Sequence, residues 1–134
     1  MSGMARAHRT VGWGFVGLVV LQFFLAGIGI FGAASFDAHA INGTLLLVLA
    51  LVLVLLALAG RLGGGVIAIS VLLFVLTGVQ GALPGLRDGA AVIAALHPLN
   101  ALALLVLGHA VAHGRTLATL VPRRVAAPRA RAAG

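Results

Sequence analysis

Two pairs of polar residues with the same spacing stand inside apolar stretches of the sequence. His39 precedes Asn42 by three residues, and His97 precedes Asn100 by three residues. Residues three apart lie on one face of a helix, about one turn from each other. An imidazole nitrogen can bind a metal, and a neighbouring hydrogen-bonding group can orient the ring. The two pairs are therefore candidate ligands for a cofactor.

Both pairs belong to an internal repeat. When the sequence is shifted against itself by 58 positions, each histidine and each asparagine falls on its counterpart, and Gln22 falls on Gln80. The chain contains no other glutamine or asparagine, so these matches carry much more weight than the apolar matches, which are common in so apolar a chain. The pattern predicts two duplicated helical hairpins, related by a two-fold axis along the membrane normal.

The repeat has a geometric consequence for the histidines. A two-fold axis makes the second and fourth helices face each other, with both imidazoles at one depth near the outer side. Haem iron takes axial ligands from opposite sides, so His39 and His97 are predicted as its ligands. The predicted cofactor site consists of His39, His97, Gln22, Gln80, Asn42 and Asn100.

Two other interpretations of these polar residues stay open. Intramembrane amides and imidazoles also join helices through hydrogen bonds worth about 0.6–2 kcal/mol each. A duplicated hairpin would keep such a structural clamp as readily as a cofactor site. A different ligand, such as a quinone or another metal, is the third possibility.

The composition sets the elements that must position these residues. Only 8% of the 134 residues are charged and 62% are hydrophobic, which excludes a soluble enzyme, and the chain has no cysteine for disulfides. A membrane-spanning helix needs about 20 apolar residues. Four uncharged runs have that character, at about 11–32, 40–60 and 66–83, and from about 96 or earlier to 112. The predicted fold is all-α, an up-down bundle of four transmembrane helices built from two duplicated hairpins.

The arginines predict the orientation. Eight of the nine arginines fall on one side of a four-span chain, which by the positive-inside rule places both termini in the cytoplasm of a bacterial plasma membrane. The membrane domain is expected over 1–114, with repeats at about 11–60 and 66–114, and a basic cytoplasmic tail over 115–134. Nucleic-acid binding is not expected, because the arginines flank apolar runs and form no basic face.

Three further residues near the fourth run affect its local structure. Pro98 disfavours helical geometry at the preceding residue. The fourth helix is therefore expected either to begin at Pro98 or to be kinked there. His109 and His113 lack counterparts in the first hairpin and are expected to contact the helix C-terminus or lipid phosphates.

Over residues 11–114 the chain resembles one half of haem A synthase, and it is similar to small membrane b-type cytochromes. These proteins share a duplicated hairpin with one histidine on the second helix and one on the fourth. The residues that carry the resemblance are Leu21, Gln22, Leu25, Gly27 and His39, then Gln80, Leu83, Gly85 and the stretch 96–100.

The resemblance implies that His39 and His97 bind one haem b. The synthase has two halves and an acidic residue near its histidine, whereas this chain has one bundle and only Asp37 nearby. Haem holding or electron transfer to a membrane redox partner is therefore expected, rather than catalysis. A non-catalytic accessory subunit of a membrane complex is the alternative, and a transporter is disfavoured because the spans carry no charge.

The predicted topology can be tested by cysteine labelling, since the chain has no native cysteine. A cysteine introduced at Ala34 or Gly89 should react with an impermeant maleimide added outside intact cells. Arg61→Cys should react only after the membrane is opened. Labelling of the first two positions only from the inside would reverse the orientation.

Overall fold

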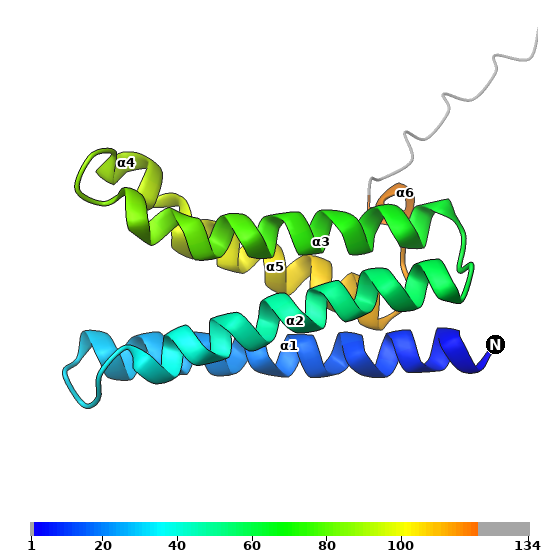
Figure 1. Cartoon of the computed structure of the whole chain (residues 1–134), viewed down its shortest axis with the longest axis horizontal. Coiled ribbons are helices and arrows are strands. Elements are labelled where there is room, and N and C mark those ends of the chain that lie inside the picture. The colour runs from blue at the N-terminus through cyan, green and yellow to red at the C-terminus, as the bar shows by residue number, and fades with distance from the viewer. Residues whose placement is uncertain (1, 121–134) are drawn as a thin grey trace, which may run out of the picture.

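The computed structural model describes residues 2–120, and every regular element in this range is helical (Figure 1). Four helices are long and apolar enough to cross a membrane, which confirms the predicted fold class. The part of the predicted tail beyond Leu120 lies outside the described residues. In chain order the elements are α1 (Gly3–Ile30), α2 (Asp37–Ala59), α3 (Gly64–Ala82), the 3₁₀ turn η1 (Leu83–Leu86), α4 (Ala91–Ala94), α5 (Leu96–Ala112) and α6 (Leu117–Leu120).

The long helices form because apolar surroundings offer no hydrogen-bond partners to the backbone. Within hydrocarbon, each N–H and C=O must be satisfied inside its own segment, and a helix does this. The charged residues accordingly lie at the helix ends and in the links. Arg61 lies between α2 and α3, and Asp37 begins α2. The four spans thus follow directly from where charge is absent.

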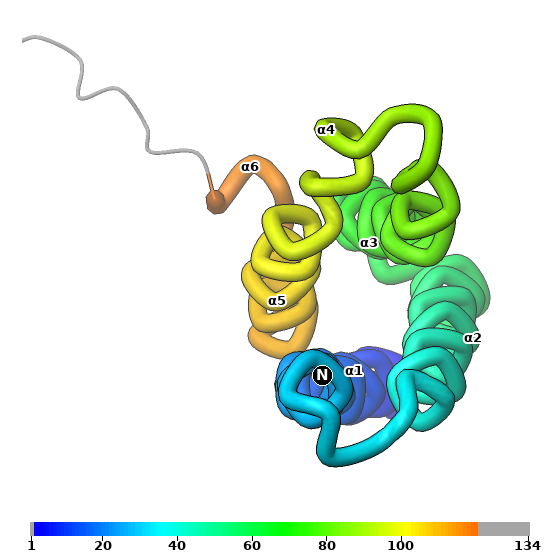
Figure 2. Tube along the Cα trace, turned by 90° about the vertical axis from the view of Figure 1, so that its left-hand side faces the viewer, coloured from blue at the N-terminus to red at the C-terminus, as the bar shows by residue number. Residues whose placement is uncertain are grey.

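The four long helices surround a common axis (Figure 2). Helix α1 contacts α2 and α5, and α3 contacts the same two helices. Helices α2 and α5 are therefore diagonal partners, as the two-fold repeat predicts. The N-terminus, the α2–α3 link and α6 lie at one end of the bundle, and the α1–α2 link and α4 lie at the other (Figure 1).

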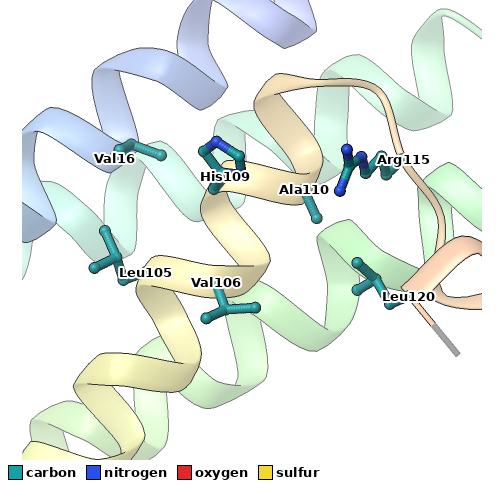
Figure 3. A pocket seen from close by; sticks show the side chains of 7 residues that line it. All are labelled: Val16, Leu105, Val106, His109, Ala110, Arg115 and Leu120. Carbon is teal, nitrogen blue, oxygen red and sulfur yellow. The ribbon is translucent and has the colours of Figure 1, made fainter. Parts of the chain in front are cut away.

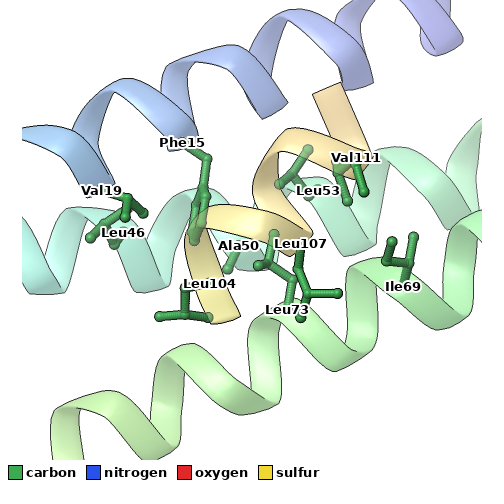
Figure 4. Close-up of a cluster of buried hydrophobic side chains, with 11 residues drawn as sticks. Phe15, Val19, Leu46, Ala50, Leu53, Ile69, Leu73, Leu104, Leu107 and Val111 are labelled. Carbon is green, nitrogen blue, oxygen red and sulfur yellow. The ribbon is translucent and has the colours of Figure 1, made fainter. Parts of the chain in front are cut away.

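All four long helices contribute to one apolar core (Figure 4). Phe15 of α1 is fully buried, and so are Leu53 of α2 and Leu73 of α3. A buried leucine or phenylalanine replaced by alanine typically costs about 2–5 kcal/mol. The core residues are Phe15, Val19, Leu46, Ala50, Leu53, Ile69, Leu73, Leu104, Leu107, Ala110 and Val111.

Helices α1 and α5 approach each other closely through two glycines. A Cβ atom on Gly12 would stand 3.0 Å from the backbone nitrogen of Ala112. A Cβ atom on Gly108 would stand 2.9 Å from the ring of Phe15. Because Gly12 has no side chain, the backbone of α5 can lie directly against α1. Because Gly108 has none, the ring of Phe15 can lie directly against α5.

The fourth span runs from Ala91 to Ala112 with a break before Pro98, which agrees with the expectation of a longer helix disturbed at the proline and not with a helix that begins there. The helix of the fourth span is interrupted at Ala95, and α5 begins at Leu96, so Pro98 occupies the third helical position. Backbone N–H groups in the first turn have no partner within the helix, so a proline there removes no bond. Pro98 therefore does not begin the helix, and its ring, which crowds the carbonyl four residues earlier at Ala94, accounts for the break at Ala95.

The close approach of α1 and α5 predicts a specific effect on stability. Gly12→Leu should lower the free energy of unfolding by about 1–3 kcal/mol, because the added side chain meets the backbone of α5. Gly17→Leu is the matched control, since nothing lies within 4 Å of a Cβ placed there. Thermal unfolding in mild detergent measures both. Equal melting temperatures for the two variants would contradict the packing of α1 on α5.

Candidate functional site

In the first hairpin, two amide side chains join α1 to α2. The Asn42 Nδ2 group donates to the backbone oxygen of Leu18 at 2.9 Å and to Gln22 Oε1 at 2.5 Å. Gln22 Nε2 in turn donates to the backbone oxygen of His39 at 2.9 Å. Asn42 is only 4% exposed, so its hydrogen bonds form away from any aqueous surface.

The second hairpin repeats this arrangement between α3 and α5. Asn100 Nδ2 donates to the backbone oxygen of Leu76 at 2.9 Å and to Gln80 Oε1 at 2.8 Å. Leu76 is the residue that the 58-position shift places on Leu18. We call these two sets of bonds the amide clamps. The sequence repeat is therefore also a repeat of hydrogen bonds.

The imidazole of His97 is held by its own hairpin. Its Nδ1 lies 3.0 Å from the backbone oxygen of Gln80. A carbonyl oxygen can only accept a hydrogen bond, so in the neutral ring Nδ1 carries the proton. The Nε2 atom is then left with its lone pair, which is the form of histidine that binds a metal.

The imidazole of His39 is less constrained. Its Nδ1 atom is buried and has no hydrogen-bond partner within residues 2–120. The ring of Phe36 packs edge-on against it, with ring centres 5.9 Å apart. An unpaired buried polar atom typically costs about 1–3 kcal/mol. This nitrogen is therefore the polar atom at the site most in need of a partner.

The two imidazoles lie opposite each other at the end of the bundle away from the N-terminus. Their ring centres are 6.2 Å apart and their planes are inclined by 46°. A metal bound by two imidazoles places their nitrogens about 4 Å apart, because each bond is about 2 Å long. The ring centres then lie farther apart than the nitrogens, by the distance from each nitrogen to the centre of its ring. The observed separation of 6.2 Å between ring centres therefore leaves room for one metal atom.

The donor set limits which metal group could be bound. Within residues 2–120, no three side chains of the types that ligate metals cluster together. A bare ion between His39 and His97 would therefore have two protein ligands. A metal that brings further ligands of its own fits this pair better.

The four amide residues were predicted as part of the cofactor site, and the structure places them beside it. Each of their hydrogen bonds described above runs to a backbone oxygen or to the other amide of the same hairpin. Gln80 contacts the imidazole of His97 through its backbone oxygen and not through its side chain. The amide clamps therefore act on the histidines by setting the position of the helices.

The sequence did not indicate a buried pair at the N-terminal end of the bundle. His8 is 2% exposed, and its Nε2 lies 3.0 Å from the hydroxyl of Ser70. That hydroxyl donates to the backbone oxygen of Val66, so it accepts from His8. The signal for burial was present, because His8 is four residues before Gly12 and seven before Phe15, on the buried stripe of α1.

Near the same end, three aromatic rings form a surface cluster. Trp13 packs edge-on against His109 and His113, with ring centres 5.7 Å and 5.0 Å apart. His113 Nδ1 also contacts the backbone oxygen of His109 at 3.0 Å, where α5 ends. The expected contact with the helix C-terminus is thus present for His113, whereas the imidazole of His109 packs on Trp13 and His113.

One family model matches part of the chain. Residues 22–86 are similar to a family of unknown function, DUF6220. The matched segment runs from Gln22 through α2 and α3 into η1, and so includes His39 and Asn42 but ends before His97. Neither a curated protein nor a solved structure matches the chain. The likeness therefore covers the first amide clamp and leaves the activity to be argued from the site.

Because Asn42 and Asn100 make equivalent bonds, replacing either of them should have a similar effect. Asn42→Leu and Asn100→Leu should each lower the free energy of unfolding by about 0.6–2 kcal/mol. Thr44→Val is the control, because the Thr44 hydroxyl bonds only within its own helix, to the backbone oxygen of Ala40. The free energy of unfolding can be measured in lipid bilayers or detergent. If both asparagine variants were as stable as the control, the amide bonds would not stabilise the bundle.

Proposed function

We propose that the protein binds one haem b, with His39 and His97 as the two axial ligands. The observation that carries this proposal is the pair of imidazoles from diagonal helices, with ring centres 6.2 Å apart. Two ligands on opposite sides of a single metal atom are what a six-coordinate haem iron needs from a protein. Cofactor sites of helix bundles are commonly built in this way, from side chains on facing helices.

The residues present fit this group in their chemistry. His97 offers Nε2 because Gln80 holds its Nδ1, and His39 has a buried nitrogen without a partner within the described residues. In haem, the porphyrin would supply the iron's other four nitrogen ligands, so no third protein ligand would be needed near His39 and His97. When bound, haem supplies one-electron redox chemistry.

The chain's own residues bind and orient rather than react. The amide clamps fix the depth of α2 and α5, and the backbone of Gln80 sets the ring orientation of His97. The nearby carboxylate of Asp37 accepts a hydrogen bond from Ser35 at 2.8 Å. These features favour haem holding or electron transfer with a membrane partner over catalysis.

A second candidate function follows from the amide clamps themselves. Every one of the four amide side chains has a hydrogen-bond partner without any cofactor. A non-catalytic accessory subunit of a membrane complex would need no more than this locked bundle. The two facing imidazoles favour haem binding over the purely structural role, because neither ring takes part in the amide bonds.

The absorption spectrum of the purified protein separates these functions. Protein expressed with sufficient haem and purified in mild detergent should show the Soret band and reduced α-band of six-coordinate b-type haem. His39→Ala or His97→Ala should abolish or strongly alter these bands, because one imidazole leaves the iron with an open position. The effect should be larger for His97→Ala, since its ring is already held by Gln80.

The control variants are His109→Ala and His113→Ala. The rings of these histidines have centres 4.2 Å apart, with planes inclined by 42°, and pack on Trp13 where α5 ends, whereas His97 lies where α5 begins. Both variants should keep the spectrum of the unsubstituted protein. A folded, colourless protein from haem-replete cells would contradict haem binding and leave the accessory role.

A further inference from the structure

An apolar groove runs along the surface where α1, α5 and α6 meet (Figure 3). Its volume is about 350 Å³. Val16 of α1, Val106 of α5 and Leu120 of α6 contribute apolar walls. His109 and Arg115 also line the groove, and Arg115 comes from the link that follows α5. The groove thus passes from apolar walls to a guanidinium group.

The end of the bundle that carries Arg115 is uniformly cationic. Arg6 and Arg9 lie in the first turns of α1, and Arg61 lies in the α2–α3 link at the same end (Figure 1). The only acidic side chains of the sequence, Asp37 and Asp88, belong to the opposite end. These two carboxylates are therefore too far away to neutralise the arginines of this end.

Aromatic side chains border the same groove. Trp13 packs against His109, which lines the groove, and 49% of its surface is exposed. Tryptophan is enriched where hydrocarbon meets the lipid headgroups, because its ring is apolar and its N–H is polar. Trp13 therefore marks the arginine end of the groove as the level of the headgroups.

We propose that this groove binds an anionic phospholipid, with one acyl chain along the apolar walls and the phosphate at Arg115. A guanidinium group matches a phosphate through paired hydrogen bonds as well as charge. The volume lies near the lower limit of about 300 Å³ for small-molecule pockets, so it suits one chain rather than a whole lipid. This site is separate from the histidine pair and does not depend on haem.

Photocrosslinking at the groove tests the proposal directly. The full chain would carry a benzophenone amino acid in place of Val106, whose side chain is 60% exposed. It would be placed in vesicles of equal parts phosphatidylglycerol and phosphatidylcholine with identical acyl chains. Mass spectrometry should show adducts of phosphatidylglycerol in about fivefold excess, the preference expected from one arginine at an anionic surface.

Two arginine variants show whether Arg115 causes this preference. Arg115→Gln should reduce the adduct ratio to about one. Arg87→Gln is the matched control, because it removes the same charge at the opposite end, where Arg87 pairs with Asp88 at 3.5 Å. The control should keep the excess. An unchanged ratio in Arg115→Gln would overturn the proposal by showing a general attraction to the arginine end.

The other possible occupants give distinct and contrary results. Crosslinks from position 106 to this chain's own residues 121–134, or to a second copy, would mean that protein covers the groove. Loss of the phosphatidylglycerol excess on adding millimolar inorganic phosphate would indicate a site for a free anion. Equal labelling of the two lipids would show that the groove selects no headgroup. Each of these results would overturn the assignment.

Discussion

Asn42 and Asn100 each lie between two helices in a bundle that is otherwise almost entirely apolar. An amide in such surroundings must find partners, and here each asparagine binds a backbone oxygen and a glutamine on the neighbouring helix. A helix advances about 1.5 Å per residue, so sliding one helix by a single residue would break bonds of 2.9 Å. Apolar packing alone tolerates such shifts better than directed bonds do. The amide clamps therefore fix the register of both hairpins.

The positions of the two histidines follow from that register. His39 and His97 are each one helical turn before a clamped asparagine, and α2 and α5 are diagonal in the bundle. The clamps set the depth of each ring within its own hairpin, and the packing of α1 on α5 and of α2 on α3 then brings the two rings together at the same end. The halves then differ in how the ring is held, because His97 contacts the backbone of Gln80 while His39 Nδ1 has no partner in the described residues. Only one of the two rings is oriented before anything binds.

Much of this arrangement could be predicted from the sequence because it depends on signals that are rare in the chain. Charge is absent from four long runs, and glutamine and asparagine occur only in the repeat. The acceptors of the amide bonds could not be predicted, because every residue offers a backbone oxygen. The sequence also left open whether the fourth helix begins at Pro98 or is kinked there, since the proline rule allows either.

The pair formed by His8 and Ser70 was missed for a different reason. The repeat places His8 on Val66 and Gly12 on Ser70, so this contact joins positions that are not equivalent in the two halves. A comparison of the halves finds only what they share. This contact crosses the bundle between the diagonal helices α1 and α3, and the polar pattern does not specify which residues meet there. Burial of His8 was nonetheless readable from its helical spacing to Phe15.

Solid-state NMR with ring-¹³C-labelled histidine tests most directly whether the clamped helices bring the two imidazoles together. In lipid bilayers, ¹³C spin diffusion should connect His39 with His97, whose ring centres are 6.2 Å apart. His109 and His113, at 4.2 Å, provide an internal positive control in the same sample. The structure predicts both cross-peaks, and the first should disappear in His39→Ala. A spectrum that shows the control cross-peak without one between His39 and His97 would contradict the facing of the two rings.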